Sequence, residues 1–238
     1  MTGAVFLSII IPAYNEAKKI REDIGHLYGY LNRQSFSFEV IVVDDGSTDE
    51  TYTILQSFEK QYKNLHIIHC PQNRGKGHAI RTGVGAANGE IIFFADAGTC
   101  VPYFETNKGI HLLRNGYDIA IGSRALSNSK IVLAQPRYRQ IGSKVFNIFA
   151  RSLMGVHTIQ DLQCGFKFFK RAAAMAIFPT NTINGMMFDL ETLLKAQKLG
   201  YKIKEFPVTW KNDPETKLKP ISGGIRILWE LFLIKLRK

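Results

Sequence analysis

The sequence predicts an α/β protein with a mixed, mostly parallel sheet that is flanked by helices. Short runs of β-branched residues alternate with helical stretches through the first half of the 238-residue chain, which is the pattern of βαβ units. The strand runs are almost wholly apolar, and such strands lie in a sheet that is covered on both faces. The composition agrees, because 45% hydrophobic and 21% charged residues are typical of a globular domain with its own core.

The first half supplies four predicted strands. They are residues 6–11, 39–43, 65–69 and 90–95. Pro12 is expected to end the first strand. A helix is predicted over residues 17–32, where apolar side chains recur at spacings of three and four. Either Ser47 or Thr48 is expected to cap the helix that follows the second strand.

The second half is less regular. Strands are expected over residues 117–122 and over residues 201–210, where polar and apolar side chains alternate. Helices are expected over residues 143–154 and 188–198, and Gly200 follows the second of them as a helix-terminating glycine. These elements would complete the sheet and its helical layers.

Polar motifs follow three of the predicted strands. They are Pro12-Ala13-Tyr14-Asn15-Glu16, Asp44-Asp45-Gly46-Ser47 and Asp96-Ala97-Gly98. Each alone would read as a turn. The carboxyl ends of parallel strands, however, meet at the edge of the sheet where ligands bind. Three acidic clusters at one edge of a chain with a net charge of +11 predict a site for a nucleotide and a divalent cation, because carboxylates hold ribose hydroxyls and hard metal ions.

A glycine-rich segment, Asn73-Arg74-Gly75-Lys76-Gly77-His78, lies between the third and fourth strands. Its glycines allow the backbone to approach a phosphate closely, and Arg74 and Lys76 add positive charge. The spacing matches neither the P-loop motif nor the dinucleotide-binding fingerprint. The segment therefore indicates a phosphate neighbour without specifying the nucleotide.

These motifs, in this order, resemble those of family 2 glycosyltransferases, which are inverting nucleotide-sugar enzymes of the GT-A fold. The matching segments are SIIIPAYNE, VIVVDDGSTDET, NRGKGHAIRTG, IIFFADA, IAIGSR, QDLQCGFKFF and FDLETLLKAQKLGYKIKEFPVTW. The last three are similar to the polyprenyl-phosphate branch, in particular to dolichyl-phosphate β-glucosyltransferases. The resemblance implies transfer of a hexose, foremost glucose from UDP-glucose, onto a polyprenyl phosphate.

The resemblance also implies roles for individual positions. The nucleotide-sugar donor would be bound by Pro12, Tyr14, Glu16, Asp44, Asp45, Lys76 and Asp96. Asp96 would also be the ligand of Mg²⁺ or Mn²⁺. The acceptor phosphate would meet Arg124, Arg137 and Arg139. Asp161 would lie with Arg124 at the reacting centre.

One departure from the family pattern concerns the metal. The resemblance implies an Asp-x-Asp motif, whereas this chain has Asp96-Ala97-Gly98. One carboxylate with diphosphate oxygens and water can still hold Mg²⁺, which commonly uses one or two protein carboxylates. We expect a cation that is bound more weakly, or a requirement for Mn²⁺.

The chain is expected to form one catalytic domain over residues 1–221, with a nucleotide-sugar half at 1–115 and an acceptor half at 116–221. Residues 222–238 are expected to form an amphipathic helix, with Arg226, Glu230 and Arg237 on one side and a wide apolar arc opposite. Such a helix suits peripheral contact with a membrane. Packing against a partner subunit or against the domain's own core are the alternatives.

The compartment follows from what the sequence contains. No apolar run approaches the roughly 18–20 residues that span a bilayer, and the first apolar run leads directly into a strand motif. The three cysteines form no C-x-x-C pair, which fits a reducing compartment. We therefore expect a cytoplasmic protein, peripheral on the cytoplasmic face of a membrane.

Other functions remain open at this point. Transfer onto a sugar acceptor, in polysaccharide or glycolipid synthesis, would require Asp161 as a general base. Gly98 is also compatible with a catalytically silent nucleotide-sugar-binding protein. Nucleic-acid binding is disfavoured, because no such motif is present and the polar motifs are acidic. A phosphate acceptor is already an anion, so it needs positioning by Arg124 more than deprotonation.

Overall fold

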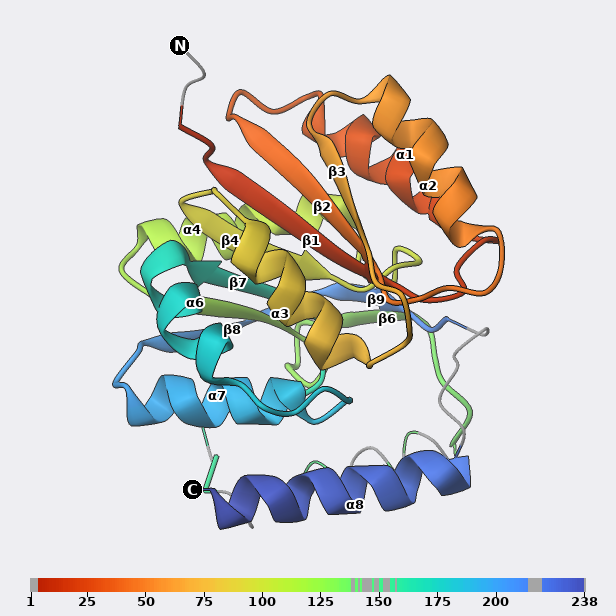
Figure 1. Cartoon of the computed structure of the whole chain (residues 1–238). Coiled ribbons are helices and arrows are strands. Elements are labelled where there is room, and N and C mark those ends of the chain that lie inside the picture. Colours follow the sequence, from red (N-terminus) through yellow and green to blue (C-terminus); the bar gives the residue numbers. More distant parts are fainter. Residues whose placement is uncertain are drawn as a thin grey trace.

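The computed structural model describes residues 4–137, 140, 142, 147, 150–151, 155–156, 158–213 and 220–237. Its strands form a seven-stranded sheet in the order β3-β2-β1-β4-β7-β5-β8 and a two-stranded sheet of β6 and β9 (Figure 1). The strands are β1 (Leu7–Ala13), β2 (Phe38–Asp44), β3 (Leu65–His69), β4 (Ile91–Ala95), β5 (Ile119–Ser123), β6 (Lys130–Leu133), β7 (Phe166–Lys170), β8 (Ile203–Pro207) and β9 (Thr209–Lys211). All neighbours in the large sheet are parallel except β7, which is antiparallel to both β4 and β5. The predicted mixed, mostly parallel sheet is confirmed.

Helices cover both faces of the large sheet. They are α1 (Ile20–Leu31), α2 (Thr51–Gln61), α3 (Lys76–Ala86), α4 (Thr106–Arg114), α6 (Arg171–Ile177), α7 (Phe188–Lys198) and α8 (Pro220–Leu236), with short 3₁₀ turns at η1 (Tyr103–Glu105) and η2 (Phe178–Thr180). The apolar residues of α1, α2 and α4 pack on one face, and those of α3, α6, α7 and α8 pack on the other. Because both faces are covered, β1, β2 and β4 are apolar along almost their whole length.

Most strand and helix limits lie within three residues of the expected ones. Strand β3 and helix α7 have the predicted bounds. Strand β1 does not end before Pro12 but runs on to Ala13, with Pro12 paired in register with Val43. A proline removes only its own N–H from the ladder, so the strand continues beyond it.

The predicted strand over residues 201–210 is two strands. It divides at Val208 into β8, which joins the large sheet, and β9, which pairs with β6. Strand β8 ends at Pro207 because the chain then turns to β6, where the carbonyl oxygen of Val208 accepts a hydrogen bond from the N–H of Lys130 at 3.0 Å. The helix expected over residues 143–154 lies largely outside the described residues.

Neither Ser47 nor Thr48 caps helix α2, so that prediction is wrong. The N-cap position is Glu50, without a side-chain cap. The Ser47 hydroxyl instead accepts a hydrogen bond from the backbone N–H of Asn15 at 2.9 Å, and the N–H of Thr48 donates to Asn15 Oδ1 at 2.7 Å. A tertiary contact between the loops after β1 and β2 has taken the place of the local cap.

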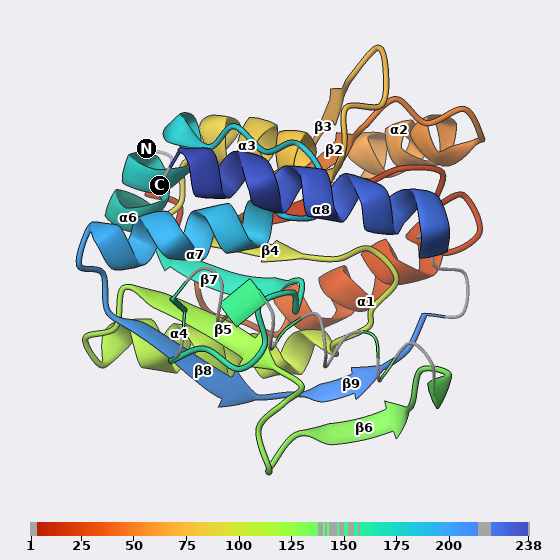
Figure 2. The ribbon, with the colours of Figure 1, turned by 90° about the horizontal axis from the view of Figure 1, so that it is seen from below.

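Helix α8 lies next to α7 on the outer side of its layer (Figure 2). Leu231 and Ile234 are buried in the core of that face. Glu230 is buried as well, and its carboxylate accepts a hydrogen bond from the N–H of Met187 at 3.0 Å. Gly185 makes room for it, since a Cβ there would lie 1.9 Å from Glu230 Oε1. The side of the helix that was expected to be polar therefore includes a residue whose side chain is buried against the domain.

Both halves of the chain contribute strands to the large sheet, with β1–β4 from residues 1–115 and β5, β7 and β8 from residues 116–221. Among the described helices, none combines the length and apolar character needed to cross a membrane.

Candidate active site

The polar motifs after β1, β2 and β4 meet at one edge, because these strands are adjacent and parallel in the sheet. The contact of Asn15 with Ser47 and Thr48 joins the first two loops. Asn15 has a positive φ of 54°, a conformation that asparagine tolerates better than most residues. The predicted convergence of the motifs is therefore present in the structure.

Asp44 ends β2 and is fully buried. Its Oδ2 lies 2.7 Å from Nδ1 of His69, and its Oδ1 accepts a hydrogen bond from the N–H of Ser47 at 3.2 Å. The His69 ring in turn stacks on Tyr52 with the ring centroids 4.2 Å apart. Sequence reasoning missed His69, because only the register that pairs Asp44 with His69 across β2 and β3 brings the two together.

Asp45 organises the glycine-rich segment. Its carboxylate accepts hydrogen bonds from the backbone N–H of Arg74, at 3.1 and 3.2 Å, and of Gly75, at 2.7 Å. Gly75 has a φ of 108°, which favours glycine at the start of α3. The acidic loop after β2 and the basic segment after β3 are thus parts of one structure.

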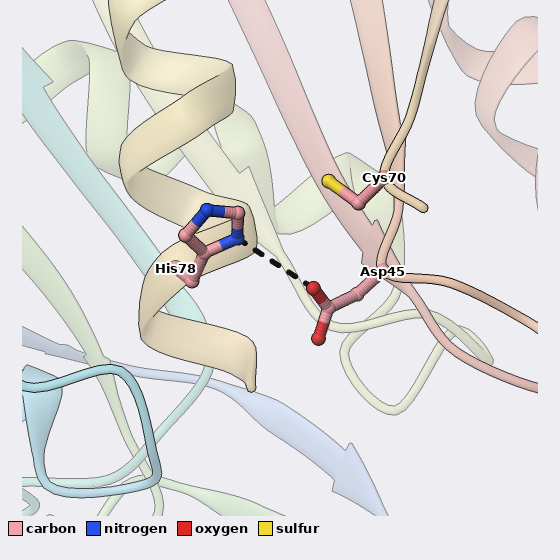
Figure 3. A group of neighbouring side chains, drawn as sticks. All are labelled: Asp45, Cys70 and His78. Carbon is pink, nitrogen blue, oxygen red and sulfur yellow. Dashed lines mark ion pairs between the residues drawn. The ribbon is translucent and has the colours of Figure 1, made fainter. Parts of the chain in front are cut away.

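Asp45 also lies beside Cys70 and His78 (Figure 3). His78 Nδ1 is 3.6 Å from Asp45 Oδ1, and one ligand atom of each of the three residues lies within 4.8 Å of the others. A Cys–His–Asp set suits Zn²⁺ better than Mg²⁺ or Mn²⁺, which prefer oxygen ligands. Burial, with Asp45 and Asp44, raises the pKa of the Cys70 thiol, which therefore stays protonated near neutral pH. We assign these residues to the wall of the site rather than to the cation of a glycosyl transfer.

Asp96 follows β4 and faces the first residue of α3. Its carboxylate forms an ion pair with the ammonium group of Lys76. Gly165 packs closely against the same carboxylate. A Cβ at residue 165 would lie 2.1 Å from Asp96 Cγ, so a larger residue would displace Asp96. Burial disfavours the charged form of Lys76, but Asp96 and Asp189 outweigh it and hold the pKa of Lys76 above its usual range. Lys76 is thus a permanent positive charge at the N-terminus of a helix.

Arg124 and Asp161 form a bidentate ion pair. Arg124 Nε donates to Asp161 Oδ2 at 2.7 Å and Nη2 donates to Oδ1 at 2.8 Å, while the backbone N–H of Arg124 donates to Oδ2 at 2.9 Å. Glu205 holds the loop in place by accepting from the N–H of Gln160 and of Asp161. Trp210 lies under the guanidinium at 5.4 Å. Burial opposes ionisation of Asp161, but Arg124 outweighs it, so the pKa of this carboxyl is lowered.

A second buried ion pair lies below the site and was missed in the sequence. Lys167, inside the apolar strand β7, is fully buried and donates to Asp189 Oδ1 at 2.6 Å and to the carbonyl oxygen of Cys164 at 2.7 Å. Its ammonium group also lies 5.6 Å from the centre of the Phe94 ring. The pair ties α7 to the segment that carries Asp161.

The remaining candidate residues are placed as follows. Pro12 and Tyr14 are half-buried at the end of β1, and Glu16 forms an ion pair with Lys19 at 2.9 Å. Arg137 is exposed, and Arg139 lies outside the described residues. Glu191 on α7 accepts backbone hydrogen bonds from residues 182 and 183.

The family model described as glycosyl transferase family 2 matches residues 8–178. The chain belongs to this family, as the motifs predicted. It is 36% identical over 245 residues to the dolichyl-phosphate β-glucosyltransferase of Dictyostelium discoideum, covering 98% of this chain and 75% of the relative. It is 33% identical over 244 residues to the human protein of the same name, covering 97% and 75%.

Solved structures show the same fold. Glucosyl-3-phosphoglycerate synthase from Mycobacterium tuberculosis, in complex with Mn²⁺, UDP and phosphoglyceric acid, superposes with a TM-score of 0.71 at 17% identity. The similarity covers 99% of this chain and 78% of that protein. The fold is therefore that of the GT-A glycosyltransferases.

Proposed function

We propose that this protein transfers glucose from UDP-glucose onto a polyprenyl phosphate of the dolichyl-phosphate type, with inversion at the anomeric carbon. Relatives that align over nearly the whole chain carry the name of this activity. An oxygen of the acceptor phosphate would attack the anomeric carbon, and the bond from that carbon to UDP would break. UDP would leave with the bonding electrons, so the step needs no proton.

The state of Asp161 is the observation that carries the choice of acceptor. Its two oxygens accept three hydrogen bonds from Arg124, and its pKa is lowered. Such a carboxylate is a poor general base, whereas a sugar hydroxyl acceptor would need one. A phosphate is already ionised and needs charge compensation, which a guanidinium supplies. We assign that role to Arg124, with Arg137 and Arg139 as further contacts of the acceptor.

The donor would bind at the convergent edge. Pro12, Tyr14, Glu16, Asp44 and Asp45 would hold the uracil and the ribose. Lys76 would meet the diphosphate, because its charge stands at the N-terminus of α3, where backbone N–H groups and the helix dipole also favour an anion.

A divalent cation, Mg²⁺ or Mn²⁺, would be held by Asp96. The Asp96 carboxylate suits such an ion, because its described partner is already a positive charge, the ammonium group of Lys76. A divalent cation can replace that ammonium group. When bound, the ion would neutralise charge that develops on the departing UDP. Asp96 would position the donor, and the ammonium group of Lys76 would compensate the negative charge of the diphosphate.

A transfer assay tests the function. Purified protein with labelled UDP-glucose and a short polyprenyl phosphate should yield labelled lipid, and chelation of divalent cations should abolish the product. UDP binding without labelled lipid, for every donor in a panel of UDP-hexoses, would instead favour a catalytically silent nucleotide-sugar-binding protein. Label on an added sugar acceptor and not on lipid would favour the polysaccharide or glycolipid alternative.

Contact with the membrane would come from the outer face of α8. Trp229, Phe232 and Leu236 are 59%, 52% and 67% exposed, and the exposed Lys235 lies among them. The opposite side of the helix is anchored in the core by Leu231 and Ile234. A docked helix with exposed aromatic and basic side chains suits the interface of an anionic bilayer, which would bring the site to its lipid acceptor.

Replacing both Trp229 and Phe232 with serine should reduce co-sedimentation with anionic vesicles at least tenfold, because both side chains would enter the interface. Point substitutions are preferable to deletion, since Leu231 and Ile234 belong to the core. Phe104→Ser is the matched control, because Phe104 is 58% exposed and precedes α4 on the other face of the sheet. Equal vesicle binding by the double variant and the control would exclude α8 as the contact.

A further inference from the structure

The loop after β4 contributes one carboxylate, Asp96, to the proposed cation site. The segment after β9 runs beside this loop. The N–H of Lys211, at the end of β9, donates to the carbonyl oxygen of Cys100 at 2.9 Å. This contact brings the residues after β9 alongside residues 96–100. Asp213 follows two positions later, and its side chain is 19% exposed.

Asp213 reaches the position where Gly98 lacks a side chain. A Cβ built on Gly98 would lie 3.7 Å from Asp213 Oδ2. An aspartate at residue 98 would place its own carboxylate about two bonds beyond that Cβ. The carboxylate of Asp213 and the ammonium group of Lys19, whose Nζ lies 3.5 Å from the same Cβ position, therefore border the space that a side chain at residue 98 would enter, although Asp213 comes from 115 positions further along the chain.

We propose that Asp213 is the second carboxylate ligand of the divalent cation, opposite Asp96. This inference rests on the proposed function, because it takes the cation of that site as given. Mg²⁺ is commonly held by one or two protein carboxylates together with phosphate oxygens and water. The segment after β9 would thus provide the second carboxylate that the loop after β4 lacks.

In the structure, the Asp96 and Asp213 carboxylates each form an ion pair with a lysine. Asp96 pairs with Lys76, and Asp213 pairs with Lys19, which also contacts Glu16 at 2.9 Å. A divalent cation bound between Asp96 and Asp213 would take the place of the two ammonium groups and leave Lys76 to the donor diphosphate.

The test measures Mn²⁺ binding to the full-length protein with saturating UDP, by electron paramagnetic resonance of the free ion. Asp96→Asn and Asp213→Asn should each weaken Mn²⁺ binding at least tenfold, because loss of a ligand costs no less than the 10–100-fold loss typical of an outer-shell partner. Glu22→Gln is the control, because it removes one exposed carboxylate of α1 and should change the affinity less than twofold. UDP binding in chelator should be unchanged in Asp213→Asn.

A further variant separates a metal ligand from a structural tether. Lys19→Gln removes the described ion-pair partner of Asp213 but keeps the Asp213 carboxylate, so this variant should bind Mn²⁺ within threefold of wild type. Equal losses in Lys19→Gln and Asp213→Asn would overturn the inference. It would also be overturned if Asp213→Asn bound Mn²⁺ like wild type while Asp96→Asn did not, a result that leaves the proposed function intact. Melting temperatures check that all variants are folded.

Discussion

Replacing Arg124 with lysine should lower the turnover of glucosyl transfer at least 100-fold, while the Michaelis constant for the donor changes little. The guanidinium makes a two-pronged contact with Asp161, which a single ammonium group cannot reproduce. Lysine would leave Asp161 short of donors and would misplace the positive charge that compensates the acceptor phosphate. Loss of one preorganised donor of this kind costs about 10²–10³ in turnover.

Steady-state kinetics with varied lipid acceptor measures the effect. Arg114→Lys provides the control, since Arg114 is exposed on α4 and lies over Phe6 rather than in the site. If Arg124→Lys kept a third of the wild-type turnover, Arg124 would be a structural partner of Asp161 and not a contact of the acceptor.

The same pair has a defined pH signature. Because the pKa of Asp161 is lowered in the folded protein, its contribution to stability is complete above the unfolded value of about 3.9. That contribution is lost as the pH falls through the folded value. The pair should therefore stabilise the fold fully across the neutral range, and acid below about pH 4 should remove its contribution.

Replacing Lys167 with methionine should lower the free energy of unfolding by about 3–5 kcal/mol. The substitution leaves the carboxylate of Asp189 buried without its partner and removes the donor to the carbonyl oxygen of Cys164. An uncompensated buried charge costs far more than the ion pair gains, so the loss is larger than for a surface lysine. Equilibrium unfolding in urea, followed by circular dichroism, measures it.

Two further variants define the cause. The double variant Lys167→Met/Asp189→Leu should recover much of the loss, because apolar side chains of similar volume often replace a buried ion pair at little cost. Lys198→Met, an exposed position on the same helix as Asp189, should change stability by less than about 0.5 kcal/mol. A loss below about 1 kcal/mol in Lys167→Met alone would mean that Asp189 needs no cation.

The candidate site shows where sequence reasoning succeeds. The carboxyl ends of parallel strands share one edge, so finding Asp44 and Asp96 after β2 and β4 was enough to place them at the same edge of the sheet. It fails where a residue's partner is distant. Lys167 reads as an interruption in an apolar strand until Asp189 on α7 is seen beside it. The helical projection that grouped Glu230 with Arg226 and Arg237 likewise held no information about Met187, whose N–H donates to the Glu230 carboxylate.

The sequence by itself determined the α/β class, most strand positions, the family and the edge of the sheet where the polar motifs meet. These depend on local periodicity and on motifs that are short and contiguous, which one chain displays directly. Only the tertiary structure decided the partners: His69 for Asp44, Met187 for Glu230, and the arrival of Asp213 beside Gly98. Partners come from strand register and loop paths across 25 to 115 positions, and no local pattern encodes which distant side chains those paths bring together.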